Sequence, residues 1–286
     1  MHLDKPALFA RLGYVPHTLQ AEVHASNAPR RVLACGVRWG KSRSAAMEAI
    51  YGALQPSDKL HPRRGWIVAP DYGLADKVFR EVALIARERI PFFLREDKEH
   101  AITLTNTGGG VCELRAKTAE NPTALLGEGL DFLVVDEAAR LRPDIWERYL
   151  SARLIDKKGW ALLISTPRGK GWFFDAWRRG QNERDPLWKS WNAPTLSNPY
   201  IDRAEVETVR ARIPETVFRQ EYEADWIEGA GAVFRNVREL ATGDWQEPIA
   251  GKRYAAGLDL ARIEDFTVLT IMDVSERRVV HVDGLH

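Results

Sequence analysis

The stretch RRVLACGVRWGKSRSAAMEAI, residues 30–50, begins with a short apolar run and enters a helical pattern through a loop with two glycines. The Gly-Lys-Ser at 40–42 has the form of the end of a phosphate-binding loop. Such a loop turns backbone N–H groups and a helix N-terminus toward a phosphate, while its lysine adds charge and its serine ligates magnesium. Cys35 stands where the motif has its first glycine, and the nearest glycine is Gly36. From these residues alone, the loop is either a variant nucleotide site or a chance match.

The composition is that of a globular chain without a strong charge bias. Its 286 residues, 45% of them hydrophobic, allow one large domain or two unequal ones. Lysine and arginine number 41 against 40 acidic residues, so any DNA-binding surface must be local. Two cysteines, Cys35 and Cys112, cannot build a disulfide framework, and a reducing compartment is the simpler interpretation. Neither a signal-peptide pattern nor an apolar run of about 20 residues is seen, so we expect an intracellular protein without a membrane segment.

The order of patterns predicts an α/β fold. Short apolar runs alternate with helical patterns, which indicates a mostly parallel sheet flanked by helices. Strands are expected over 32–35, 66–69, 132–135 and 161–165, a hairpin over 102–114, and helices over 41–54 and 74–85. Two further helical patterns lie between Asp202 and Trp226, with Pro214 at the start of the second.

A second motif favours a real nucleotide site. In LDFLVVDEAARL, residues 130–141, an apolar run leads into Asp136 and Glu137. Parallel sheets bind ligands beyond the carboxyl ends of their strands, so both carboxylates are expected at the binding edge. Asp136 would complete a magnesium shell, and Glu137 would orient and deprotonate an attacking water. The alternative is an acidic helix cap after a core strand, which the presence of both motifs makes less plausible.

Two other segments carry candidate contacts. In WALLISTPRGKGWFF, residues 160–174, a buried strand ends in Ser165 and Thr166, whose hydroxyls can sense a γ-phosphate. A plain strand-ending turn is the alternative. Upstream, LGYVPHTLQ offers Tyr14 to stack on a base and Gln20 to read the adenine edge, although a lone glutamine is usually a solvated helix residue.

Taken together, the chain resembles the large terminase subunits of tailed bacteriophages, the ATP-driven motors of DNA packaging. The segments that carry the resemblance follow the family order over nearly the whole chain: LGYVPHTLQ, GVRWGKS, GWIVAPDY, LDFLVVDEAA, LLISTPRGKGWFFDAW, NAPTLSNPYI, FRQEYEADWIEGAGAVF and GLDLARIEDFTVLTIMD. Each is weak singly, and the set is specific. The family often has an altered phosphate loop with an arginine before the Gly-Lys-Ser, which identifies residues 36–42 as a terminase variant of the loop.

The resemblance implies a role for each matching residue. Gln20 would read the adenine, and Ser165–Thr166 would couple hydrolysis to movement. Arg38 matches the loop arginine, whereas Val37 occupies a place where many relatives carry another arginine. Catalysis is thereby assigned to Glu137, Arg38 and Lys41, and magnesium to Ser42 and Asp136. The residues expected to contact ATP or its magnesium are Tyr14, Gln20, Gly36, Val37, Arg38, Trp39, Gly40, Lys41, Ser42, Arg43, Asp136, Ser165 and Thr166.

One catalytic group of the family has no counterpart here. Some relatives carry an arginine shortly before the acidic strand that reaches into a neighbour's site, but TALLGEGLDF, residues 123–132, has Leu126 and no arginine. A supplied arginine can raise the rate about 10³–10⁵-fold. The remaining candidates are Arg115, Arg140, Arg142 and Arg153.

The C-terminal part resembles the first strands of the family's ribonuclease-H-like nuclease. We expect an ATPase domain over 1–230 with lid or linker helices near 200–228, a linker over 231–252, and an incomplete nuclease domain over 253–286. Asp259 matches the first metal-binding aspartate, whereas Asp265 is expected to cap a turn and Asp273 to end a strand. Because a two-metal nuclease needs several converging carboxylates, we predict no competent nuclease in these residues.

An aromatic and basic cluster follows the Ser-Thr motif. Trp172, Trp177, Trp188 and Trp191 lie among Arg168, Lys170, Arg178 and Arg179. Such interleaving can follow a nucleic-acid backbone, but tryptophans packed beneath a lid, with a solvated arginine face, are the favoured interpretation. The seven histidines show no metal-binding spacing.

The function that the resemblance implies is an ATP- and Mg²⁺-dependent motor that moves double-stranded DNA into a procapsid in the host cytoplasm. A portal protein, a small terminase subunit and a ring of copies on the portal are the implied partners, with a monomer expected in solution. A helicase-like translocase is one alternative, but it would need a second motor domain. A non-catalytic nucleotide-binding interaction module is another, and the intact Lys41, Ser42, Asp136 and Glu137 argue against it.

Overall fold

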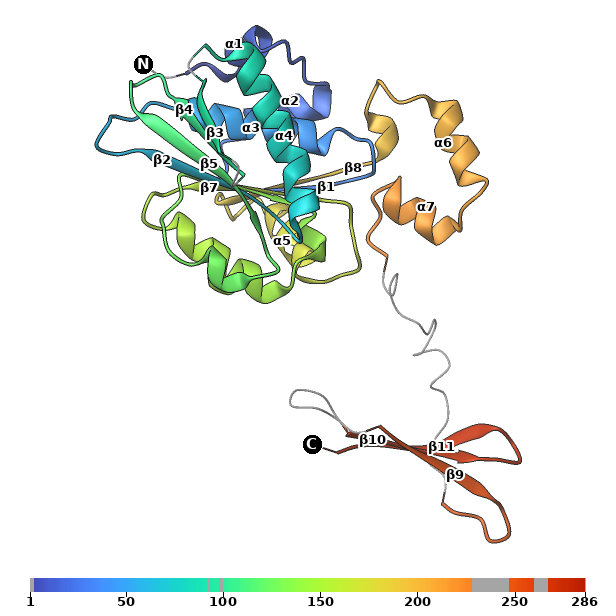
Figure 1. The fold of residues 1–286 in the computed structure, drawn as a ribbon. Helices are drawn as coiled ribbons and strands as arrows, with labels where there is room; N and C mark the ends of the chain where they lie inside the picture. The colour runs from blue at the N-terminus through green and yellow to red at the C-terminus, as the bar shows by residue number, and fades with distance from the viewer. Residues whose placement is uncertain (1–2, 92, 98–99, 228–246, 260–266, 286) are drawn as a thin grey trace. The chain divides into compact units, whose positions relative to one another are not determined.

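The computed structural model describes residues 3–91, 93–97, 100–227, 247–259 and 267–285 (Figure 1). The chain divides into two compact units, Met1–Gly231 and Ala232–His286. Part of the expected linker, residues 231–246, lies outside the described residues.

The first unit is built on an eight-stranded sheet with the order β3-β4-β5-β2-β6-β7-β1-β8. The strands are β1 (Arg30–Cys35), β2 (Arg63–Ala69), β3 (Phe93–Asp97), β4 (Ala101–Thr105), β5 (Val111–Thr118), β6 (Phe132–Asp136), β7 (Trp160–Ser165) and β8 (Trp188–Ala193). In the order in which they lie in the sheet, the six strands β5-β2-β6-β7-β1-β8 are all parallel to one another. The remaining pairs, β3 with β4 and β4 with β5, are antiparallel. This confirms the predicted α/β class, the four expected strands and the hairpin over 102–114.

Helices cover both faces of this sheet (Figure 1). On one face lie α1 (Lys5–Arg11), α2 (Thr18–Ala25), α3 (Lys41–Leu54) and α4 (Tyr72–Arg89); on the other lie α5 (Trp172–Gly180) and the short turns η1 (Pro122–Leu125), η2 (Ala138–Arg140), η3 (Ile145–Leu150) and η4 (Ser151–Leu154). The predicted helices after Lys41 and before Pro91 are confirmed. Beyond β8, η5 (Thr195–Ser197) leads to α6 (Arg203–Arg210) and α7 (Glu215–Glu221). Pro214 is the N-cap of α7, as the sequence predicted.

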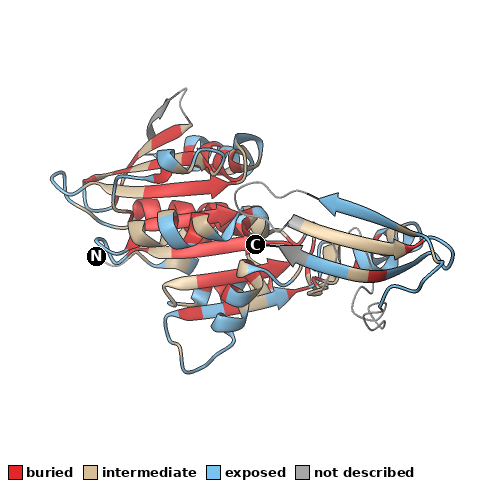
Figure 2. Cartoon of the chain, turned by 90° about the horizontal axis from the view of Figure 1, so that it is seen from below, coloured by how far each residue is buried: buried red, intermediate tan, exposed pale blue. Residues whose placement is uncertain are grey.

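The core forms because each central strand is apolar on both sides. Along β1, Val32 and Ala34 belong to the hydrophobic cluster on the α5 side, and Leu33 and Cys35 to the cluster under α3 and α4. Successive strand side chains point to opposite faces, and all four side chains are fully buried. Figure 2 shows the same pattern across the sheet, with buried residues concentrated in the strands. A strand without polar alternation therefore reads as a central strand.

The tryptophan cluster is part of this packing. Trp172, Trp177 and Trp188 belong to or pack against the α5-side cluster, while Trp191 packs against the opposite one. Trp226, just after α7, packs on Trp177 with ring centroids 5.5 Å apart. The side chains of Arg178 and Arg179 are 70% and 55% exposed. The predicted packing of the rings, with a solvated arginine face, is confirmed. The sequence missed that Trp188 and Trp191 lie on a strand.

The second unit is an antiparallel sheet with the order β11-β10-β9. Its strands are β9 (Tyr254–Asp259), β10 (Thr267–Asp273) and β11 (Arg278–Leu285). Asp259 ends β9 and Asp273 ends β10, and the register pairs Asp273 with Tyr254, so the two aspartates lie at opposite ends of the sheet. The Asp273 carboxylate forms an ion pair with Lys252 at 2.9 Å. It also accepts a hydrogen bond from the N–H of Ser275 in the turn that follows β10. Asp265 lies outside the described residues, and the nuclease-like role of Asp259 stays a prediction.

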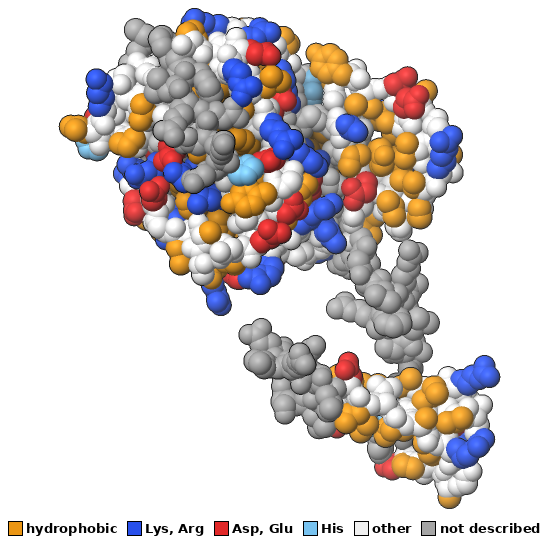
Figure 3. Space-filling model, in the orientation of Figure 1, with side chains coloured by type: hydrophobic (Ala, Val, Ile, Leu, Met, Phe, Trp, Pro, Cys, Tyr) orange, Lys and Arg blue, Asp and Glu red, His pale blue; other side chains and the backbone are white. Residues whose placement is uncertain are grey.

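Charged side chains of both signs are interspersed over the visible face of the molecule (Figure 3). This agrees with the net charge of +1. Within the part of the chain that the structure describes, no helix has the length and apolar character needed to cross a membrane.

Candidate nucleotide-binding site

Three sequence-distant motifs meet at one edge of the parallel sheet. In the ladders, Ala34 of β1 pairs with Ser165 of β7, and Asp136 of β6 pairs with Ile164 of β7. The carboxyl ends of these three strands therefore lie together, which is where open parallel sheets bind ligands. The phosphate loop follows β1, the two carboxylates follow β6, and the Ser-Thr pair follows β7.

Side-chain contacts join the three motifs directly. The Lys41 ammonium donates to the Thr166 hydroxyl at 3.4 Å. The Ser165 hydroxyl donates to Oε2 of Glu137 at 3.5 Å. Glu137 has a left-handed backbone with φ 51°, and its N–H donates to the Asp136 carboxylate at 2.9 Å. A non-glycine residue in this conformation costs about 1–3 kcal/mol and is typical of functional sites.

Asp136 is suited to bind a cation. Its side chain is buried, and burial, followed by repulsion from Glu137, raises its pKa to about 6 against the opposing effect of Lys41. A divalent ion would offset this penalty by favouring the ionised form. Ser42 lies in the first turn of α3, and carboxylate and hydroxyl oxygens of this kind suit Mg²⁺, which keeps water and phosphate oxygens as its other ligands. The residues present thus fit the expected metal.

The loop between β1 and α3 takes its shape in an unusual way. Gly40 is the N-cap of α3 with φ 97°, a conformation that glycine accepts without strain. Arg38 has φ 60°, so a side chain occupies a left-handed position in the middle of the loop. At Gly36 an added Cβ would lie 2.4 Å from the Thr195 hydroxyl and 2.6 Å from the Tyr222 carbonyl oxygen. The glycine stands at 36 because another segment of backbone passes there.

Cys35 lies in the core and takes no part in the loop. Its thiol is fully buried, and burial raises its pKa to about 12. The next two residues already use their N–H groups within the protein: Gly36 donates to Ala193 O at 3.0 Å and Val37 to Glu221 O at 2.7 Å. The groups that can face an anion therefore come from Arg38 onward and from the N-terminus of α3.

Two loop side chains that were expected to contact ATP have other partners in this structure. Trp39 is fully buried, with its indole N–H donating to Ser197 Oγ at 2.9 Å and its ring edge-on to His17. Arg43 is exposed and pairs with Glu81 of α4. Contact of either side chain with a nucleotide stays a prediction.

A pocket of about 330 Å³ opens beside Glu137. It is lined by Val37, Glu137, Arg140, Ser165, Thr166, Pro167, Arg168, Gln220 and Glu221, so the end of α7 forms one wall. Arg140 approaches Oε2 of Glu137 at 3.6 Å. The other arginine candidates lie elsewhere: Arg115 pairs with Glu113, Arg142 with Asp144, and Arg153 bonds the carbonyl of Gly127. Arg140 is the candidate that the fold brings to the site.

Gln20 is held between its own helix and the phosphate loop. Its amide nitrogen donates to Gly40 O at 3.3 Å, and its oxygen accepts from the N–H of His17 at 3.2 Å. The side chain is only 5% exposed. A role in reading adenine stays a prediction, and in this structure both ends of the amide are bonded within the protein.

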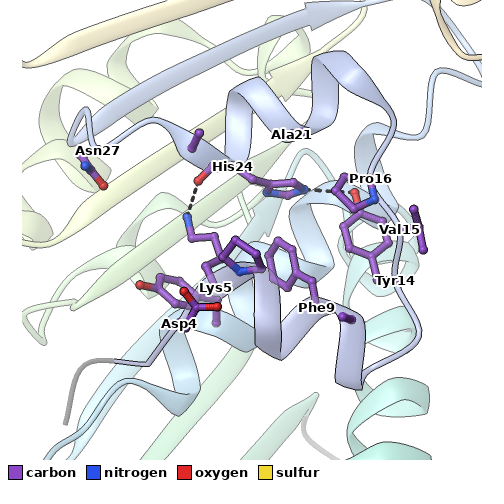
Figure 4. Close-up of a pocket in the computed structure, with 13 residues that line it drawn as sticks. Asp4, Lys5, Phe9, Tyr14, Val15, Pro16, Ala21, His24 and Asn27 are labelled. Carbon is purple, nitrogen blue, oxygen red and sulfur yellow. Dashed lines mark hydrogen bonds between the residues drawn. The ribbon is translucent and has the colours of Figure 1, made fainter.

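Tyr14 lies in a different pocket, of about 500 Å³, between α1 and α2 (Figure 4). Its hydroxyl is 3.0 Å from Nε2 of His24, and its ring packs edge-on to Phe9. The lining comes from residues 4–27 and Tyr51. The same histidine contacts Glu48 of α3 at 2.6 Å, so this region braces the back of the phosphate-loop helix. Base stacking by Tyr14 stays a prediction.

Two residues that the sequence did not single out hold the loop from outside. Thr195 and Asn198 bond the carbonyls of Val37 and Arg38, at 2.7 and 3.0 Å. Both lie in NAPTLSNPYI, which carried the family resemblance without an assigned role. The signal available was a run of hydroxyl and amide side chains directly after a strand.

The fold and this constellation define a P-loop nucleotide-binding α/β protein. The model of the terminase large subunit, T4-like-virus type, N-terminal part, matches residues 32–240, and the chain belongs to this family. The large terminase subunit of Thermus phage G20c is 30% identical over 97% of this chain, and that of Escherichia phage T5 is 30% identical over 94%. The chain spans about 64% of the length of the first relative and 63% of the second.

Solved structures agree with the family. The ATPase domain of the Thermus phage P74-26 large terminase is 30% identical, covers 79% of this chain and 100% of its own, and superposes with a TM-score of 0.67. The large terminase of another thermophilic bacteriophage, in complex with ADP, covers 94% of this chain and 68% of its own with a TM-score of 0.64. At 12% identity the latter indicates the shared fold alone.

Proposed function

We propose that this chain is the ATP-hydrolysing part of a large terminase subunit, and that hydrolysis drives double-stranded DNA into a viral procapsid. The observation that carries the proposal is the meeting of Lys41, Glu137 and Thr166 at one edge of the sheet. Family membership supports ATP as the nucleotide. It also supports a portal protein, a small terminase subunit and other copies of the chain as partners.

The residues divide the chemistry between them. Lys41 and the N-terminus of α3 attract the phosphates. Ser42 and Asp136 would hold Mg²⁺, which offsets charge on the phosphate oxygens when bound. Glu137 takes a proton from the attacking water. Because Ser165 and Arg140 both approach its Oε2, its Oε1 is the oxygen left to face that water.

Ser165 and Thr166 connect the site to the rest of the motor. Thr166 contacts the phosphate-binding lysine and Ser165 contacts the base. The chain then runs through Gly169, with φ 60°, into α5, on which Trp226 packs. A change in the position of Ser165 and Thr166 on loss of the γ-phosphate would thus be transmitted along the chain to the start of α5. Nuclease activity is not expected from residues 253–286 alone.

The decisive experiment is ATP turnover per chain across a wide range of protein concentration, with Lys41→Ala as control. Arg140 lies in the chain's own pocket, so we expect lysine-dependent turnover that stays constant on dilution. Turnover that rises with concentration would place the arginine in a neighbouring copy. Turnover equal to that of Lys41→Ala at every concentration, with and without portal and DNA, would contradict the ATPase assignment.

A further inference from the structure

Four consecutive carbonyl groups of the phosphate loop each meet a side chain from outside the loop. Thr195 Oγ1 donates to Val37 O at 2.7 Å, Asn198 Nδ2 to Arg38 O at 3.0 Å, His17 Nε2 lies 3.4 Å from Trp39 O, and Gln20 Nε2 donates to Gly40 O at 3.3 Å. All four outside residues are buried, from 1% exposed for Thr195 to 9% for Asn198. They come from two segments far apart in sequence.

This pattern has a physical purpose in an anion site. A phosphate loop turns its N–H groups toward the anion, which turns its carbonyl groups toward the protein. Buried carbonyls need donors. In a glycine-rich loop the backbone can find this shape unaided, but here Val37, Arg38 and Trp39 occupy the middle of the loop. Donors placed opposite the carbonyls of residues 37–39 fix a conformation that these residues would not adopt freely, and Gln20 adds a second donor to Gly40 O, which also accepts from Ser44 N–H within α3.

The two donor pairs are themselves fixed in place. Gln20 and His17 are joined at the start of α2, where the Gln20 side-chain oxygen accepts from the N–H of His17. Because the Trp39 carbonyl can only accept, the contact with it requires the proton on Nε2 of His17, and Nδ1 has no hydrogen-bond partner among the residues that the structure describes. On the other side, Thr195 N–H donates to Tyr222 O at 2.7 Å, and Asn198 Oδ1 accepts from the N–H of Tyr200 at 3.0 Å. This second pair therefore links the loop to the end of α7.

We propose that Thr195, Asn198, His17 and Gln20 are positioning residues for phosphate binding, which hold the carbonyl groups of residues 37–40 from outside and so fix the loop although its middle contains no glycine. The inference rests on the proposed nucleotide site. Thr195 also ties that site to the residue directly after α7, because its N–H donates to Tyr222 O, so nucleotide binding and the placement of α7 depend on the same residue.

The test removes single donors while keeping shape. Thr195→Val lacks the hydroxyl, and Asn198→Asp and Gln20→Glu lack the amide donor but keep the oxygen that each uses as an acceptor. The probe is N-methylanthraniloyl-ATP with Mg²⁺, titrated into the full 286-residue chain. We expect Kd to rise about 3- to 10-fold for each single variant and more for Thr195→Val with Asn198→Asp. Thr195→Ser, which keeps the hydroxyl, should bind as the parent does.

Thr208→Val is the matched control, because its hydroxyl bonds the carbonyl of Ala204 within α6 and away from the loop. Melting temperatures measured on every variant separate loss of folding from loss of positioning. If the donor variants melt earlier but bind with the parental Kd, the four bonds are ordinary structural contacts and the inference is wrong. If the parent and Lys41→Ala bind equally, the nucleotide site itself is wrong, which is a different result.

Discussion

The carboxylates that end β6 and the phosphate loop after β1 lie at the same edge of the sheet, with β7 between the two strands, yet they take their shapes from different sources. Asp136 and Glu137 continue a fully buried strand, and their place depends on that strand and its parallel neighbours. The loop depends on side chains 158 and 160 residues further along the chain, Thr195 and Asn198. One half of the site is set locally and the other is imposed from outside.

This difference separates two kinds of mutational effect. Changes at the carboxylate edge should alter the rate of reaction with little effect on binding, because Glu137 acts on the water. Changes at the loop should alter affinity, because they disturb groups that hold the phosphates in the ground state and transition state alike.

The largest effect is expected for Glu137→Gln, which keeps the size and oxygen contact of the side chain but removes the base. We expect kcat to fall about 10²–10⁴-fold, while the Kd for the fluorescent ATP analogue stays within about twofold of the parent. Single-turnover hydrolysis and equilibrium titration measure the two quantities. Hydrolysis at the parental rate would show that another group activates the water, and the comparison between the two halves would lose its basis.

The next effect concerns stability and a part of α3 beyond the loop. Glu48 is fully buried and bonds Arg31 at 2.7 Å, Lys5 at 3.0 Å and His24 at 2.6 Å. Burial alone would raise its pKa, but Arg31, the hydrogen bond from His24 and Lys5 outweigh burial and hold its pKa well below the usual range. Glu48→Gln should lower the free energy of unfolding by about 3–5 kcal/mol, because the buried Arg31 and the partly buried Lys5 lose their counter-charge.

The same shift predicts a pH dependence with a definite sign. A carboxyl whose folded pKa is depressed contributes stability above its unfolded value of 4.5 and loses it as pH falls below that value. Denaturant unfolding at about pH 7 and about pH 3.5 measures how far the free energy of unfolding falls on acidification. This fall should be smaller in Glu48→Gln than in the parent. The control is Glu81→Gln, which breaks a partly exposed pair with Arg43, a residue of α3 like Glu48, and should cost no more than about 1 kcal/mol. Equal losses in both variants would mean that the buried network adds nothing.

Local pattern was enough to predict one half of the site. The apolar run before Asp136 and Glu137 predicted a central strand and placed both carboxylates at its carboxyl end, and Gly-Lys-Ser followed by small apolar residues predicted the start of α3. These features depend on neighbours within a few residues. The alternation predicted a mostly parallel sheet but not its strand order; the order β6-β7-β1 brings Lys41 to Thr166 and Ser165 to Glu137.

The outside donors could not be predicted in the same way. A bond from Asn198 to the carbonyl of Arg38 leaves no periodic trace in either segment, because it uses one side chain and one backbone group. For Gln20, the sequence suggested hydrogen bonds to adenine or to solvent. Which partner its amide has in the fold depends on how α2 packs against the loop. The choice among the arginines likewise needed the fold: Arg140, at the end of η2, approaches Glu137, whereas Arg142, two residues later, pairs with Asp144.

The smallest effect is expected where the motif looks most damaged. Cys35→Gly restores the glycine that the sequence lacks, yet the structure places the thiol in the core and gives the close approach to Gly36. We expect a loss of about 1–2 kcal/mol in unfolding free energy, from the lost buried side chain and the more flexible strand residue. The Kd for the ATP analogue should stay within about twofold of the parent. Clearly tighter binding in Cys35→Gly would mean that the missing glycine limits the loop after all, and that the outside donors only compensate for it in part.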